Sequence, residues 1–123
     1  MSSGMLGSSV LVTISKVKNI AALEDVQILL SLLDQICKQF SLTVVQSTGH
    51  QFLPKGASAV KVLAESHIAV HTWPEIHSCT LDVHLCGKTI TQAPKRHYKA
   101  TMVTQAFANL LGGIITKETK VDH

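Results

Sequence analysis

The sequence predicts an α+β domain, a two-layer sandwich in which helices cover one face of an antiparallel sheet. Six short segments are rich in β-branched residues or alternate apolar with polar ones, as strands do. Two longer segments repeat apolar residues every three or four positions, as helices do. The element order is then β-α-β-β-β-β-α-β. Because two helices cannot cover both faces of so much sheet, we expect a second copy of the chain on the other face.

The first half of the chain predicts a strand, a long helix, a strand and a loop. Ser8–Ser15 is short and β-branched, which favours a strand. The helix spans Asn19–Phe40, capped by Asn19, with its apolar stripe formed by Leu23, Val26, Leu30, Leu33, Cys37 and Phe40. On that stripe Cys37 is expected to be a core thiol. A strand over Leu42–Ser47 follows, and the breakers Pro54 and Gly56 indicate a loop over Gly49–Gly56.

The second half predicts three strands, a helix and a last strand. The three strands are Ala57–Ala64, His67–Trp73 and Thr80–Leu85. Pro94–Leu111 begins with a proline, ends before two glycines and turns an apolar stripe inward, as a helix does. Ile114–Lys120 completes the sheet.

Composition limits the class of protein. The 123 residues are 46% hydrophobic and 15% charged, which predicts one folded domain over residues 1–123. The net charge of +3 is scattered and only 4% of residues are aromatic, which argues against nucleic acid as a partner. No apolar run reaches the roughly 18 residues of a membrane span. Three cysteines without a CxxC pair, and no secretory start, favour a reducing, cytoplasmic setting.

Polar residues of catalytic types gather around Glu65–Trp73 and in the next strand. Strand alternation puts Glu65, His67 and His71 on one face, and Asp82, His84 and Cys86 share a face one strand later. A metal would be one use, but two histidines four residues apart on a strand are roughly 13 Å apart, so we expect no metal. A serine or cysteine hydrolase remains open, although no GxSxG elbow is present. A solvated strand edge explains single residues of this set but not all of them.

One motif in this region resembles a known family. Glu65-Ser66-His67-x-x-x-His71-Thr72-Trp73-Pro74-Glu75, then Asp82-Val83-x-x-Cys86-Gly87, resembles the prokaryotic S-adenosylmethionine decarboxylase proenzymes. The upstream Phe52-x-Pro54-x-Gly56-x-Ser58 is similar to the segment that precedes the site in that family.

The resemblance implies a self-processing enzyme with a covalent pyruvoyl cofactor. Cleavage between Glu65 and Ser66 would give a β chain, 1–65, and an α chain, 66–123, with Ser66 converted to the pyruvoyl group that forms a Schiff base with the substrate amine. By the pattern of the family, His71 and Ser58 assist processing, and Cys86 returns a proton after CO₂ leaves. The product would be the aminopropyl donor for spermidine synthesis.

The resemblance also implies a homodimer of αβ protomers with the small-molecule substrate bound by Phe52, Trp73 and Glu75. Phe52 is equally consistent with an ordinary core residue. Three departures from the family pattern concern the substrate: Lys88 replaces a carboxylate, the strand Val10–Ser15 lacks the usual glutamate, and the segment Thr89–His97 diverges. A pyruvoyl-dependent decarboxylase of ornithine or arginine, with Asp82 facing the distal cation, is therefore an alternative. A non-catalytic paralogue that partners an active decarboxylase is another.

Overall fold

The described residues form one six-stranded sheet that is antiparallel throughout. The computed structural model describes residues 7–86 and 98–122. In the sheet the strands lie in the order β2-β3-β4-β5-β1-β6. Strands β2 to β5 are neighbours both in sequence and in the sheet, β1 pairs with β5, and β6 pairs with β1. The bounds are β1 Gly7–Ser15, β2 Val44–Gln51, β3 Ala57–Leu63, β4 Ser66–Trp73, β5 Ser78–Cys86 and β6 Ile114–Asp122.

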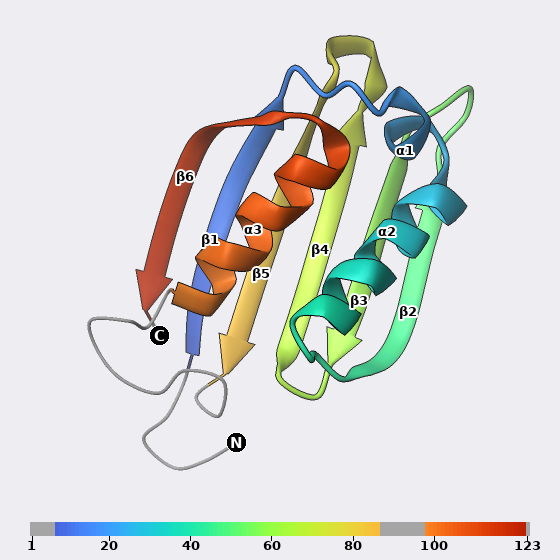
Figure 1. Cartoon of the computed structure of the whole chain (residues 1–123). Coiled ribbons are helices and arrows are strands. Elements are labelled where there is room, and N and C mark those ends of the chain that lie inside the picture. Colours follow the sequence, from blue (N-terminus) through green and yellow to red (C-terminus); the bar gives the residue numbers. More distant parts are fainter. Residues whose placement is uncertain (1–6, 87–97, 123) are drawn as a thin grey trace.

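The α-helices of the described residues all lie on one face of this sheet (Figure 1). They are α1 Ile20–Glu24, α2 Val26–Gln39 and α3 Tyr98–Leu111, and a short 3₁₀ helix, η1 Pro74–Ile76, joins β4 to β5. The predicted α+β two-layer sandwich is therefore confirmed. The predicted start of the last helix at Pro94, and Lys88, lie outside the described residues.

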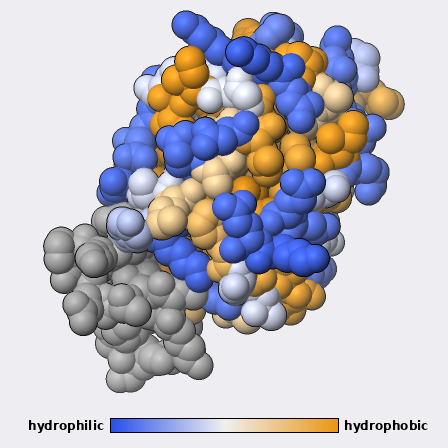
Figure 2. Space-filling view, viewed as in Figure 1, coloured by the Kyte–Doolittle hydropathy of each residue, from blue (hydrophilic) through white to orange (hydrophobic). Residues whose placement is uncertain are grey.

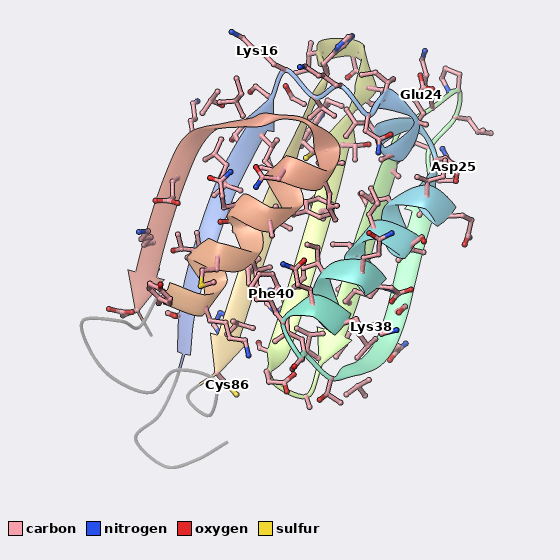
Figure 3. The ribbon with its side chains drawn as sticks, viewed as in Figure 1. Lys16, Glu24, Asp25, Lys38, Phe40 and Cys86 are labelled. Atoms are coloured by element: carbon pink, nitrogen blue, oxygen red, sulfur yellow. The ribbon has the colours of Figure 1, made fainter. Side chains whose placement is uncertain are left out.

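The prediction of one helix over Asn19–Phe40 was wrong, because the helix is interrupted at Asp25. Asp25 is extended, with φ −125° and ψ 118°, and its carboxylate accepts hydrogen bonds from the N–H groups of Gln27 and Ile28. The Gln51 side chain bridges the break, accepting from Val26 N and donating to Glu24 O. Figure 3 shows Glu24 and Asp25 at this junction. An aspartate that caps a new helix leaves the apolar period unchanged, so periodicity could not detect it.

The predicted loop over Gly49–Gly56 was also too long. Strand β2 continues to Gln51, and Gly49 pairs with Ala59 of β3. A Cβ at Gly49 would lie 2.6 Å from Val26 Cγ2, so this glycine allows α2 to pack closely on the sheet. A glycine that looked like a turn residue is thus a helix contact. The remaining loop ends at Gly56, where φ is +121°.

The core lies between the helices and the sheet. Strand residues alternate into it, and the fully buried helix residues include Leu29, Leu33, Ile36, Phe107 and Leu111. The helical side itself exposes both hydrophilic and hydrophobic residues (Figure 2). No helix within the described parts of the chain is long and apolar enough to cross a membrane.

The opposite sheet face carries no helix of the described chain (Figure 1). Apolar residues are partly exposed there: Leu11 is 47% exposed, Val62 39% and Val121 44%. Polar side chains of β4 and β5 share this face. We call it the open face; its coverage by a second copy of the chain stays a prediction.

Candidate active site

The turn between β3 and β4 holds Ser66 in an unusual backbone conformation. Leu63 pairs with Ser66, so Ala64 and Glu65 form the whole connection. Ser66 has φ +141°, a region that residues with a Cβ rarely adopt and that stores about 1–3 kcal/mol of strain. The turn is anchored on the far side by Thr43, whose N–H donates to Glu65 Oε1 at 3.0 Å and whose carbonyl accepts from Ala64 N.

The peptide carbonyl before Ser66 has a donor aimed at it. Cys86, the last residue of β5, donates its backbone N–H to the Glu65 carbonyl oxygen at 2.7 Å. A single well-aligned N–H at this distance is the kind of group that stabilises charge developing on a carbonyl oxygen. Glu65, Ser66 and Cys86 therefore form one group, which we call the cleavage group.

A second group of predicted residues lies further along the same strands. Ser58 on β3 pairs in register with His71 on β4, and Ser58 Oγ lies 2.7 Å from His71 Nδ1. This pair is on the open face. We call Ser58 and His71 the serine–histidine pair.

A pocket of about 290 Å³ adjoins the serine–histidine pair. Its lining includes all three residues that the sequence assigned to the substrate, and consists of Phe52, Lys55, Gly56, Ser58, His71, Thr72, Trp73, Pro74 and Glu75. Phe52 is 47% exposed and meets the His50 ring edge-on at 4.6 Å, so it is not a core residue. Lys55 forms a 3.1 Å ion pair with Glu24.

The cleavage group and the serine–histidine pair are far apart in one chain. Ser66 and His71 are five residues apart on an extended strand, which is about 17 Å. Figure 3 shows Cys86 at the end of the sheet opposite to Glu24, whose partner Lys55 lines the pocket. The sequence motif therefore folds into two groups rather than one.

Sequence reasoning missed how His67 is placed. Its Nδ1 lies 3.5 Å from Ser66 Oγ, and its Nε2 lies 3.5 Å from Asp82 Oδ2. The His67 and His84 rings stack with centroids 5.4 Å apart and planes 8° from parallel. Strand alternation had put these side chains on one face, but the contact with Ser66 depends on the turn. Within the described residues no group of three His, Cys, Asp or Glu could hold a metal ion.

The other two thiols lie in the core and belong to neither group. Cys37 is buried on α2, which confirms the predicted core thiol. Burial raises the pKa of Cys37, Lys61 nearby lowers it, and Asp34 and Glu65 raise it. Burial alone raises the pKa of Cys79 to about 12. Both thiols are therefore protonated and unreactive at neutral pH, unlike a catalytic cysteine.

The chain is similar to known decarboxylases over most of its length. A family model described as S-adenosylmethionine decarboxylase matches residues 9–109. An S-adenosylmethionine decarboxylase proenzyme of Thermodesulfovibrio yellowstonii is 34% identical over 102 residues, 83% of this chain and 72% of that protein. A proenzyme of the same name from Thermotoga maritima is 40% identical over 68 residues, 55% of this chain and 52% of that protein.

A solved structure agrees with these relatives. The crystal structure of the adenosylmethionine decarboxylase from Aquifex aeolicus has a TM-score of 0.71 and 31% identity, covering 97% of this chain and 89% of that one. With several of the curated relatives, the match spans about half of their length. The family model and the Thermodesulfovibrio relative, which both match most of the chain, show that this protein belongs to the S-adenosylmethionine decarboxylase family.

Proposed function

We propose that the chain is a proenzyme that cleaves itself between Glu65 and Ser66 and then decarboxylates S-adenosylmethionine. The observation that carries this proposal is the geometry of the scissile bond. Ser66 has φ +141°, and the carbonyl of Glu65 accepts a 2.7 Å hydrogen bond from Cys86 N–H. Strain raises the energy of the bond to be broken, and the N–H stabilises the oxyanion that forms. The names of the relatives support the substrate.

Self-cleavage would use the cleavage group first. Ser66 Oγ attacks the Glu65 carbonyl carbon, the oxygen becomes an oxyanion held by Cys86 N–H, and the C–N bond breaks to leave an ester and a free amine. Removal of the Ser66 Cα proton then expels the Glu65 carboxylate and ends the β chain at residue 65. The remaining dehydroalanine loses ammonia on hydrolysis. The pyruvoyl carbonyl so formed supplies an electrophile for the substrate amine and an electron sink for decarboxylation.

The serine–histidine pair completes this site from a second protomer. His71 is the base expected to remove the Ser66 Cα proton, but it lies about 17 Å along its own strand. A two-fold axis through the open face would place the Ser58–His71 pair of one protomer over Ser66 of the other, since such an interface brings the same two patches together twice. The partly exposed Leu11 and Val62 on that face support a homodimer.

The pocket next to the serine–histidine pair would receive the substrate. Phe52 and Trp73 offer exposed aromatic surfaces to the adenine, and Glu75 offers a carboxylate to the ribose hydroxyls. Ligand pockets usually measure about 300–1,000 Å³, and the pocket of one chain, about 290 Å³, is at the lower limit. The partner would supply the rest of the site, including the pyruvoyl end, with Cys86 beside it as the proton donor for the product.

The intact mass of the denatured protein tests the proposal. Two chains, 1–65 and 66–123, with the second lighter than its sequence by one ammonia, are expected, and Ser66→Ala should remain one chain. CO₂ release from S-adenosylmethionine, ornithine and arginine then identifies the substrate, because Asp82, a carboxylate on the open face, could also serve a cationic amino acid. A wild-type protein that stays intact when purified would overturn the proposal and favour a non-catalytic paralogue.

A further inference from the structure

We infer that His67 is the general base that accepts the Ser66 hydroxyl proton in the first step of self-cleavage, and that Asp82 positions it. This inference rests on the proposed function, because a base for Ser66 has a role only if Ser66 attacks the preceding carbonyl. The serine–histidine pair cannot supply this base within the same chain, since His71 is about 17 Å from Ser66 along β4.

The contacts of His67 fix which nitrogen faces the serine. Nε2 lies 3.5 Å from Asp82 Oδ2, and an ionised carboxylate only accepts hydrogen bonds. The neutral ring therefore carries its proton on Nε2, and Nδ1 turns its lone pair to Ser66 Oγ, also at 3.5 Å. Such contacts in a resting structure are commonly long and shorten as the reaction proceeds. The order serine, imidazole, carboxylate is that of a catalytic triad, in which the imidazole accepts the proton and the carboxylate orients the ring.

The neighbouring strands limit rotation of the His67 ring. β5 places His84 directly opposite His67, and their rings stack nearly parallel. His84 is itself hydrogen-bonded through Nδ1 to Ser9 Oγ on β1. On the other side β3 places Val62 opposite His67. The imidazole plane is thus held where Nδ1 can meet Ser66 Oγ.

Glu65 has the other side chain next to Ser66 that could accept a proton, and this carboxylate makes a different contact. Its Oε1 accepts the N–H of Thr43, which anchors the turn. His67 is therefore the base that contacts the hydroxyl among the residues described.

A single proton moves twice in this step, and the step is balanced. As Ser66 Oγ bonds to the Glu65 carbonyl carbon, its proton passes to His67 Nδ1. When the C–N bond breaks, the same proton passes from Nδ1 to the departing Ser66 nitrogen, and the amine results. His67 ends neutral, ester replaces amide, and no further reactant is needed.

Cleavage kinetics of the full chain test this role. The chain is made by cell-free translation, quenched at intervals and scored by denaturing mass spectrometry. His67→Asn places an amide near the position of Nδ1 but removes its basicity, and should slow cleavage at least about 10²-fold, the usual size of general-base catalysis. His77→Asn is the matched control, because His77 is exposed at the far end of the sheet with φ +54°, which asparagine tolerates. Cleavage of His67→Asn within about threefold of wild type would overturn the inference.

Hydroxylamine identifies the step that is slowed. It cuts esters but not amides, so uncleaved His67→Asn should resist it, whereas a chain stalled at the elimination step would be cut at residue 66. Accumulation of hydroxylamine-sensitive His67→Asn would therefore place His67 after the acyl shift and overturn the inference.

The pH profile separates a base from a merely structural residue. The wild-type rate should level off once the imidazole is neutral, while His67→Asn should keep rising with pH because hydroxide must act instead. The titratable groups facing His67 are Asp82 and His84 from β5 and Glu65 in the turn; β3 presents apolar Val62. If the plateau persists in His67→Asn and disappears in His84→Asn, His84 is the base and the inference is wrong. Wild type that never cleaves would instead refute the proposed function.

Discussion

Complementation between two inactive chains would show whether the site is shared by two protomers. Ser66→Ala removes the attacking hydroxyl, and His71→Ala removes the base of the elimination. In one chain these positions are about 17 Å apart, whereas proton transfer needs contact at about 3 Å. Expressed alone, Ser66→Ala should therefore keep the intact amide, and His71→Ala should stop at the ester.

The expected yield follows from two-fold symmetry. Equal co-expression gives about half heterodimers, and each heterodimer contains one complete site, formed by Ser66 of the His71→Ala chain and His71 of the Ser66→Ala chain. About half of the His71→Ala chains should then be cleaved, and none of the Ser66→Ala chains. Intact mass distinguishes the two chains and their fragments without tags.

A second mixture is the control for the case in which the two variants do not form heterodimers. Wild type co-expressed with the Ser66→Ala/His71→Ala double variant should leave about half of the wild-type chains stalled, because their partners lack His71. Complete cleavage of wild type in that mixture, with no cleavage in the first, would refute the shared site and mean that one chain is sufficient.

Three further variants test other parts of the structure. Asp34→Ala should lower the free energy of unfolding, measured in urea, by about 2–3 kcal/mol, because it removes the carboxylate 2.7 Å from the buried Lys61 ammonium and leaves the hydrogen bond to Ser47 Oγ at 2.8 Å. Lys61→Met should stay within about 1 kcal/mol of wild type, and equal losses in the two variants would contradict this reasoning. The pKa of Cys79, raised to about 12, keeps its thiol protonated in the folded state. The free energy of unfolding should therefore keep this contribution below pH 9 and fall by up to about 1.4 kcal/mol per pH unit above it. The fall should be smaller in Cys79→Ala, measured in parallel. Cys86→Ala should still cleave, because the donor to the Glu65 carbonyl is a backbone N–H, yet it should not sustain CO₂ release if the thiol is the proton donor, since the product carbon is then not protonated correctly. An uncleaved variant would show that the thiol itself acts in processing.

Local pattern in the sequence was sufficient for the fold class but not for every element. Alternation and helical periodicity report which face of an element is buried, and they located the strands and helices to within a few residues. They failed at Asp25 and Gly49, where a cap and a close helix contact use residues that also occur in turns or helix starts. Lys61 is a third case, since a lysine on a strand gives no sign that Asp34 of α2 will cover it.

The sequence by itself determined the family motif and the chemical types of the candidate site. Ser66, His71 and Cys86 were recognised from the motif that resembles the family. Only the tertiary structure decided which of these residues meet. Strand register, set by pairing between distant segments, joins Cys86 to Glu65 and Ser58 to His71 and separates the two groups. A strand rises about 3.4 Å per residue, so residues a few positions apart in sequence are already distant, whereas partners across the sheet are in contact. Closeness in sequence therefore did not mean closeness in space.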